Sequence, residues 1–302
     1  MKHPYRIREI AARAGLSEAT VDRVLHQRGG VRESTAREVH QAIAALDREI
    51  PQSPAVPIDV IVPESMAAAV RQALETELPV VVRPRFHPVA DAVEVLNRGR
   101  SQGVILTAPD TPEIIEAIGR AGVPVVTLGT DLPASKRVAF AGIDQADAGA
   151  TAAYLVGQWL ADRAGDVLVV RGTGADGEDE RVAGFRAAMT ARKLIEAAAV
   201  DQVLAGNSAI RAVYAPAGDT AGVVDAFAEQ HRVYDVFVAH GLDAANAALL
   251  RAHKLSAVLH HDLRADVRQA GLTILRSQGV LPGPIHTQPA AVQVITPYNA
   301  SL

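Results

Sequence analysis

The sequence predicts an α/β protein with a small all-helical head and a larger core of parallel sheets flanked by helices. Three observations predict this class. The first 46 residues carry apolar side chains at helical spacings of three and four. From Ile58 onward, short β-branched runs alternate with helical stretches, which is the pattern of βαβ units. Between these parts, Pro51, Pro54 and Pro57 stand among polar residues and predict an extended linker.

The first two helices of the head are joined at a glycine. The apolar residues of the first helix share one face: Ile7, Ile10, Ala11 and Ala14. Gly15 follows, where the chain must turn sharply. Ser17 can cap a second helix, whose inward residues are Val21, Val24 and Leu25. Two short helices joined in this way form a helix-turn-helix, whose second member can lie in the major groove of DNA.

The polar residues of the second helix predict what it contacts. Its outward side chains, which face base edges in this interpretation, are Glu18, Ala19, Asp22 and Arg23, and the hydroxyls that can reach phosphates are those of Ser17 and Thr20. Arg23 is the main candidate, because a guanidinium can donate to both O6 and N7 of guanine and so discriminate between bases by roughly 1–3 kcal/mol. The alternative is a helical hairpin that only packs against the rest of the protein, with Arg23 as a solvated surface charge.

The order of residues in the head resembles the lactose-repressor (LacI/GalR) family of bacterial transcription regulators. The matching residues include Ala14-Gly15-Leu16-Ser17, Thr20-Val21-Asp22-Arg23-Val24-Leu25 and Gly29-Gly30-Val31-Arg32, and the match runs without a gap to Leu46. The resemblance implies that the groove-reading helix is 18–26 and that the phosphate contacts are Ser17, Thr20, His26, Arg32 and Thr35.

The sequence departs from the family pattern at three places. Asp22 stands where many members carry Ser, and Arg32 stands where a Ser commonly caps the third helix. The family's Tyr-x-Pro-Asn signature and hinge helix are not visible in 47–57. A side-chain wedge in the minor groove is therefore not expected here.

Composition and charge limit the class of protein. The chain has 302 residues, no Cys and a net charge of −4. No apolar run approaches the roughly 20 residues of a membrane span, and the first residues lead into a helix, so we expect a cytoplasmic protein. The first fifty residues carry nine basic and seven acidic side chains. A head with so little net charge would bind DNA weakly alone, which favours a homodimer that doubles the phosphate contacts.

The core elements follow from the alternation of apolar runs and helical patterns, because buried parallel strands are continuously apolar. Strands are expected at 58–62, 80–83, 103–106, 124–128, 138–142, 167–170, 212–214, 233–239, 257–259 and 291–295. Helices are expected near 67–77, 90–97, 111–121, 147–162, 180–192, 222–230, 244–252 and 263–278. Between Phe185 and Tyr214 there is room for little more than helices. The domains are thus a head at 1–46, a linker at 47–57 and a core at 58–302, whose two lobes divide near 145 and face each other across a cleft.

The core also resembles the sugar-binding core that the family shares with periplasmic sugar receptors. Matching segments include Gly122-Val123-Pro124-Val125-Val126-Thr127-Leu128, Glu180-Arg181-Val182-Ala183-Gly184-Phe185 and Thr296-Pro297-Tyr298-Asn299. The resemblance implies a two-lobed, periplasmic-binding-protein-like fold with effector contacts at Asp131, Arg181, His240 and His261. A carboxylate and a guanidinium can together orient a polar ligand in a cleft. The alternatives are a helix-capping Asp131, a surface salt bridge for Arg181 and ordinary loop histidines.

Two patterns suggest other chemistry. The segment 172–177 satisfies G-x-G-x-x-G after a strand, but Glu178, Asp179 and Glu180 crowd the helix start where a pyrophosphate needs positive potential. His260-His261-Asp262 suggests a metal, yet adjacent residues of a strand point to opposite faces. No H-E-x-x-H, G-x-S-x-G or P-loop pattern occurs. We therefore expect no enzyme, no cofactor and no metal site.

These expectations combine into one functional hypothesis with one alternative. The hypothesis is a transcription regulator, such as a repressor, that binds double-stranded operator DNA as a homodimer and responds to a small polar effector, a sugar or polyol. The alternative is a small-molecule-binding α/β protein or enzyme whose helical head mediates assembly. Salt dependence separates the two, because binding to DNA weakens steeply as salt rises.

Overall fold

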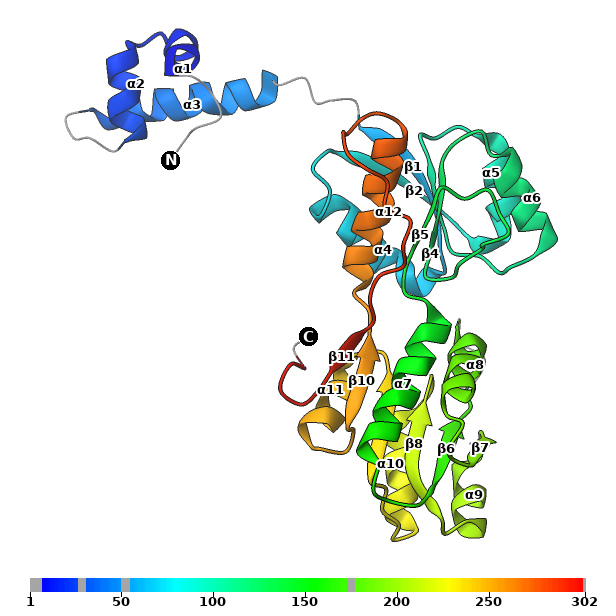
Figure 1. Cartoon of the computed structure of the whole chain (residues 1–302). Helices are drawn as coiled ribbons and strands as arrows, with labels where there is room; N and C mark the ends of the chain where they lie inside the picture. Colours follow the sequence, from blue (N-terminus) through cyan, green and yellow to red (C-terminus); the bar gives the residue numbers. More distant parts are fainter. Residues whose placement is uncertain (1–6, 27–30, 50–54, 173–176, 301–302) are drawn as a thin grey trace. The chain divides into compact units, whose positions relative to one another are not determined.

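The computed structural model describes residues 7–26, 31–49, 55–172 and 177–300 (Figure 1). The chain divides into two compact units, Met1–Ala55 and Val56–Leu302. No helix within the described ranges combines the length and the apolar character needed to cross a lipid bilayer.

The first unit is a three-helix head around a small core. Its helices are α1 (Ile7–Ala14), α2 (Glu18–Leu25) and α3 (Glu33–Glu49). The side chains buried between them are Ile10, Ala11, Val21, Val39 and Ala42. The turn between α1 and α2 depends on Gly15, whose φ of +67° is accessible to glycine at little cost. The predicted helix-turn-helix is therefore present, and its inward residues are the expected ones.

The first lobe of the second unit is a five-stranded parallel sheet in the order β2-β1-β3-β4-β5. Its strands are β1 (Val56–Ile61), β2 (Val82–His87), β3 (Val104–Leu106), β4 (Val125–Leu128) and β5 (Ala139–Ala141). Helices α4 (Glu64–Thr76) and α12 (Leu263–Ser277) cover one face. The short η1 (Val89–Asp91) leads into α5 (Ala92–Arg98), which covers the other face with α6 (Pro112–Arg120). Val56, Ile58 and Val60, at alternate positions of β1, enter the core under α4 and α12, and Ile61 enters the core under α5 and α6.

The second lobe is a six-stranded sheet in the order β11-β10-β9-β8-β6-β7. Its strands are β6 (Asp166–Val170), β7 (Leu194–Ala197), β8 (Ile210–Ala215), β9 (Val236–His240), β10 (Ala257–His260) and β11 (Gln293–Ile295). All neighbours are parallel except β10 and β11. One face is covered by α7 (Gln145–Trp159) and α8 (Glu178–Ala188), the other by α9 (Val200–Gly206), α10 (Thr220–Glu229) and α11 (Ala244–Arg251).

The chain passes between the lobes three times. It leaves the first sheet after β5, returns after β10 to form α12 on the first lobe, and then runs back to β11 (Figure 1). The first and third passages pair through an isolated bridge between Ile143 and Ala290, where the Ala290 N–H donates to the Gly142 carbonyl over 2.7 Å. The first lobe is thus assembled from two distant segments, which a single division near residue 145 does not anticipate.

Several predicted boundaries were wrong for physical reasons. Strand β7 and helix α9 lie where only helices were expected, because β7 is a four-residue edge strand without a continuous apolar run. Helix α3 continues to Glu49, and β1 begins at Val56 and includes Pro57. The predicted linker 47–57 is therefore structured at both ends, while its residues 50–54 lie outside the described ranges.

Candidate functional site

Helix α2, the predicted groove-reading helix, begins at a side-chain cap. The Thr20 N–H donates to Ser17 Oγ over 3.2 Å, and the hydroxyls of Ser17 and Thr20 are 2.8 Å apart. A Ser at this position satisfies one of the amides that a helix start leaves without an internal partner. The two hydroxyls predicted to contact phosphates therefore lie side by side at the amino end of α2.

The outward face of α2 carries the predicted base-reading residues. Glu18, Ala19 and Arg23 are exposed, whereas Val21 is fully buried in the head. Arg23 makes no hydrogen bond or ion pair with any residue that the structure describes. Its guanidinium can therefore meet a base edge without first breaking an internal contact.

Asp22 and His26 form a pair at the carboxyl end of this face. His26 Nδ1 lies 3.0 Å from Asp22 Oδ1 and 3.0 Å from the Asp22 carbonyl oxygen. The imidazole thus contacts both the backbone and the carboxylate of the residue one helical turn before it. The other two predicted phosphate contacts lie at the start of α3, where Arg32 precedes the helix and is exposed and Thr35 is half-buried in its first turn.

A pocket of about 440 Å³ lies at the carboxyl ends of β8, β9 and β10, and we name it the histidine pocket. Its lining includes Arg181, His240 and His261, three of the four predicted effector contacts. Met66 and Leu263 from the first lobe complete the wall. The carboxyl ends of parallel strands are where ligands bind in open α/β sheets.

Arg181 is fixed at the rim by two acceptors from different elements. Its Nε donates to Gln145 Oε1 over 2.7 Å, and its Nη1 donates to the Pro216 carbonyl over 2.8 Å. Both of these acceptors are neutral groups. They hold the guanidinium in one orientation.

His240 lies against Tyr214 on the neighbouring strand. Its Nε2 is 2.9 Å from the Tyr214 hydroxyl, and Tyr214 stacks on Phe185 with ring centroids 4.2 Å apart. The pKa of His240 lies well below its usual range, first because burial disfavours the charged ring and then because Arg181 and His261 oppose another positive charge. Burial also raises the pKa of the Tyr214 hydroxyl. Both groups are therefore neutral near pH 7.

The adjacent histidines at the carboxyl end of β10, His260 and His261, have separate partners. The Leu242 N–H donates to His260 Nδ1 over 3.2 Å, whereas His261 Nδ1 lies 2.6 Å from the buried carboxylate of Asp266. The pKa of His260 is lowered, mainly by burial and then by the nearby His261. Among the described residues no group of three or more side chains could hold a metal ion. His260 and His261 thus act as fixed hydrogen-bonding groups.

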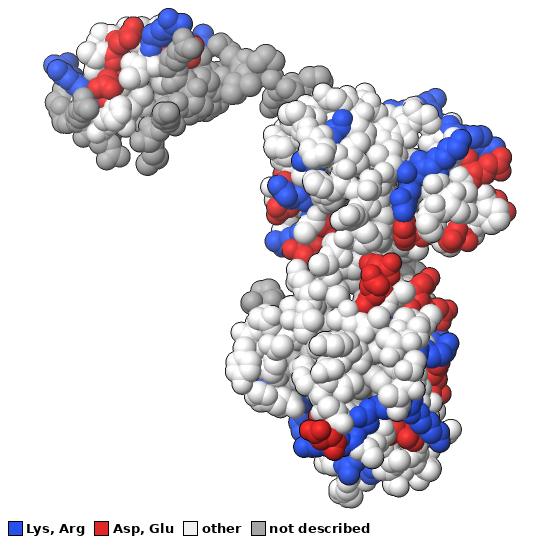
Figure 2. Space-filling view, in the orientation of Figure 1, with Lys and Arg blue, Asp and Glu red and all other residues white. Residues whose placement is uncertain are grey.

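A second pocket of about 360 Å³ also lies between the lobes, and we name it the acidic pocket. It is lined by four carboxylates, those of Asp110, Asp131, Asp144 and Glu180. Figure 2 shows acidic side chains gathered where the lobes meet. The four predicted effector contacts therefore line two pockets, with Asp131 in this one.

Asp131 is held by its surroundings. Its Oδ1 accepts the Leu132 N–H over 2.7 Å, and Arg137 donates to both carboxylate oxygens, with Nη2 2.7 Å from Oδ2. No helix begins at Asp131, which lies in the loop between β4 and β5, so the helix-capping alternative is wrong. Its position in the pocket wall and its pairing with Arg137 are compatible with each other, because a carboxylate offers about four lone-pair sites.

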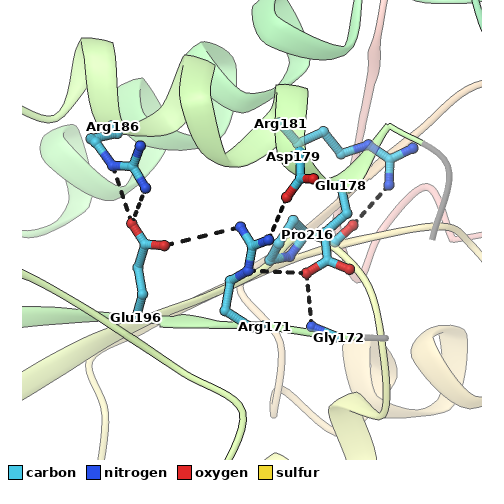
Figure 3. A network of polar contacts seen from close by, with 8 residues as sticks. All are labelled: Arg171, Gly172, Glu178, Asp179, Arg181, Arg186, Glu196 and Pro216. Atoms are coloured by element: carbon cyan, nitrogen blue, oxygen red, sulfur yellow. Dashed lines mark hydrogen bonds and ion pairs between the residues drawn. The ribbon is translucent and has the colours of Figure 1, made fainter. Parts of the chain in front are cut away.

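A polar network fixes the start of α8, which carries Arg181 (Figure 3). Glu178 is 1% exposed, and its Oε1 accepts the Gly172 N–H over 2.8 Å and lies 3.4 Å from Arg171 Nε. Arg171 also pairs with Asp179, and it lies 4.0 Å from Glu196, which pairs with Arg186. The N–H of Gly172, which is the first amide of the glycine-rich segment, is thus already hydrogen-bonded to the Glu178 carboxylate. The rest of that motif, 173–176, lies outside the described ranges.

Two glycines let α7 and α8 approach closely. A Cβ at Gly149 would lie 1.9 Å from the Arg181 carbonyl oxygen, and one at Gly184 would lie 2.0 Å from the Ala146 carbonyl oxygen. Larger residues would separate the helices. The close crossing brings Gln145 on α7 within reach of Arg181 on α8.

Sequence reasoning missed several residues that line the acidic pocket: Asp110, Asp144, Gln145 and Glu180. It also missed Tyr214 and Asp266, which contact the pocket residues His240 and His261. The sequence showed His260 as part of a His-His-Asp run. It did not indicate that the Leu242 N–H would donate to this histidine. No local pattern could have indicated Gln145 as the partner of Arg181.

Comparisons with known proteins agree with this architecture. A family model described as bacterial regulatory proteins, lacI family, matches residues 6–47, and one described as periplasmic binding protein domain matches 89–272. A search of curated proteins found no match.

Solved structures share the fold of the core. GanP, a glucose-galactose binding protein from Geobacillus stearothermophilus, is 17% identical with a TM-score of 0.68, over 83% of this chain and 100% of its own. AraP, an arabinose binding protein from the same organism, is 19% identical with a TM-score of 0.65, over 82% and 98%. A proposed LacI transcriptional regulator from Bacteroides fragilis is 15% identical with a TM-score of 0.69, over 81% and 98%.

Proposed function

This chain belongs to the lacI family of bacterial regulatory proteins, with a periplasmic binding protein domain as its core, and we propose that it regulates transcription by binding operator DNA under the control of a small polar effector. One observation carries the proposal. Helix α2, inside the segment that matches the family, presents an exposed Arg23 on the surface of a packed three-helix head, and this arginine has no hydrogen bond or ion pair with the residues that the structure describes.

We assign two kinds of DNA contact to the head. Base edges are read by Glu18, Ala19, Asp22 and Arg23, and phosphates are bound by Ser17, Thr20, His26, Arg32 and Thr35. The exposure of Arg23 and the paired hydroxyls at the start of α2 support this division. Phosphate contacts set the position of the head on the duplex, whereas base contacts set its sequence preference.

The effector of this proposal is a sugar or polyol bound between the lobes. It contacts Arg181, His240 and His261 in the histidine pocket and Asp131 in the acidic pocket. The names of GanP and AraP, which share the fold of the core, support a carbohydrate ligand. A homodimer in the cytoplasm completes the proposal, because two heads double the phosphate contacts of a head with little net charge.

Control by the effector follows from differential binding. If one arrangement of the lobes binds the effector better, the ligand shifts the population towards it. The fit of the two heads to their half-sites then changes with their spacing. No enzymatic step is part of this proposal.

The test is selection of binding sites from a random duplex pool with the purified chain, followed by affinity measurements on the selected operator. Arg23→Ala should relax base preference at one position, at a cost of about 1–3 kcal/mol for the preferred base. Thr20→Ala should weaken binding to all sequences alike. Arg8→Ala, an exposed arginine on α1, is the charge-matched control and should keep the base preference.

The following outcomes would contradict the proposal. If the chain selects no sequence at low salt, or if Arg23→Ala leaves the base preference of the operator intact, the assignment of α2 as the reading helix is wrong. Affinity for duplex that does not fall as salt rises would also contradict it.

A further inference from the structure

The histidine pocket presents hydrogen-bond donors. Arg181 is a donor at every nitrogen, and its contacts with Gln145 and Pro216 fix its orientation at the rim. His260 receives the Leu242 N–H at Nδ1. A neutral imidazole that accepts at Nδ1 carries its proton on Nε2, so the other ring nitrogen of this lining residue is a donor.

Arg181 places a permanent positive charge in the wall of this pocket. The pKa of His240 is lowered by burial and further by the charges of Arg181 and His261. Asp243 also lines the pocket, but it is exposed and its Oδ1 caps α11 by accepting the Asn246 N–H over 2.7 Å. An anionic group is therefore favoured at the Arg181 side of the pocket.

The acidic pocket presents the opposite character. Its four carboxylates only accept hydrogen bonds when ionised, and its lining contains no Lys or Arg among the described residues. The two pockets share Ile143, and the neighbouring residues Glu180 and Arg181 line one pocket each. A ligand that reaches both meets acceptors at one end and donors at the other.

We propose that the effector is a carbohydrate that carries an oxyanion, a carboxylate or a phosphate, bound by Arg181 and His260, while its hydroxyls donate to the carboxylates of the acidic pocket. This inference rests on the proposed effector function and names its ligand class. A neutral sugar would offer Arg181 only weaker acceptors. A cationic amino sugar would meet a like charge there.

The test is isothermal titration calorimetry of the full chain with matched carbohydrates. One set is glucose, gluconate, glucuronate, glucose 6-phosphate and glucosamine, and a second is the corresponding galactose series. An acid should bind about tenfold or more tightly than its neutral parent, because a hydrogen bond to a charged group contributes about that factor. The carboxylate and phosphate members distinguish the two forms of the oxyanion.

Two variants locate the oxyanion. Arg181→Gln and His260→Phe should each reduce the affinity ratio of acid to neutral parent, by about tenfold for Arg181→Gln. A loss of packing alone would lower both affinities equally and leave the ratio unchanged. Arg186→Gln removes the same charge from the same helix outside both pockets, and His286→Gln changes an exposed histidine, so both controls should keep the ratio.

The outcomes separate this inference from the proposed function. If a neutral sugar binds as tightly as its acids, or if Arg186→Gln changes the ratio as much as Arg181→Gln, the oxyanion assignment is wrong and the carbohydrate effector stands. If no member of either series binds, both the assignment and the carbohydrate effector fail.

Discussion

Glu178 decides what the start of α8 can bind. Its buried carboxylate accepts the Gly172 N–H, which is the first amide of the glycine-rich segment. A phosphate at that amide would meet a negative charge in a poorly solvated place. The acidic run at the helix start predicted this conflict from sequence, and the contact supplies the physical reason. Glu178 instead ties the ends of β6 and α8 together beneath Arg181 (Figure 3).

The contribution of Glu178 to the stability of the fold can be measured by comparison with Asp179. Glu178→Gln should lower the free energy of unfolding by about 1–3 kcal/mol, because a buried charged hydrogen-bond acceptor is lost beside Arg171. Asp179→Asn removes another carboxylate from the same arginine, but the Asp179 side chain is 81% exposed, so its effect should stay under about 1 kcal/mol. Urea unfolding of the full chain measures both. Equal effects would contradict a buried structural role for Glu178.

At the scale of elements, the crossing of α7 and α8 sets the geometry of Arg181, which we assign to the effector. The two glycines at the crossing allow backbone contact, and Gln145 and Arg181 meet as a result. Helix α7 also leads out of the first passage between the lobes. Arg181, which we assign to the effector, is therefore hydrogen-bonded to α7, the helix that directly follows that passage.

Gly184→Ala should disturb this crossing. The added Cβ would meet the Ala146 carbonyl oxygen at 2.0 Å, so the helices must separate, at a cost of about 1–3 kcal/mol in unfolding free energy. Gly157→Ala on α7 has no atom within 4 Å of the new Cβ and should be neutral or stabilise by up to about 1 kcal/mol. Thermal and urea unfolding compare the pair. A tolerated Gly184→Ala would show that the close approach is not required.

At the scale of the whole molecule, a DNA-reading head is joined to a two-lobed core. The predicted membership of the lactose-repressor family and the predicted fold class are confirmed by the two family matches and by the sheets of the core. Three passages connect the lobes, and the first and third are paired at Ile143 and Ala290. A ligand that contacts both lobes can favour one arrangement of the lobes about these passages.

The coupling between effector and operator should be reciprocal. The carbohydrate that binds best in the matched series should change operator affinity by a factor in the range of about 5–150, and operator DNA should change the affinity for that carbohydrate by the same factor. In the Arg181→Gln variant, the operator affinity should be nearly the same with and without the carbohydrate. In the Arg186→Gln variant, the carbohydrate should still change the operator affinity. Tight carbohydrate binding without any change in operator affinity would contradict the regulatory proposal.

Sequence reasoning succeeded where the signal was local. The apolar spacing that places Ile10 and Val21 inward, and Arg23 outward, lies within single helices, and the structure has the same faces. Sequence reasoning failed where an element depends on contacts with segments that are distant in the sequence. Strand β7 carries no continuous apolar run because it lies at the edge of its sheet, and α12 joins the first lobe through contacts with strands more than a hundred residues earlier.

The amino-acid order alone therefore determined the helical head, its outward arginine and the alternation of strands and helices, because caps and periodicity act over a few residues. Only the tertiary structure decided which groups face a ligand. The proton on His260 is placed by the amide of Leu242, and Arg181 is aimed by Gln145 and Pro216. Such pairings join separate elements, and their energies depend on burial, which exists only once the sheets and helices have packed.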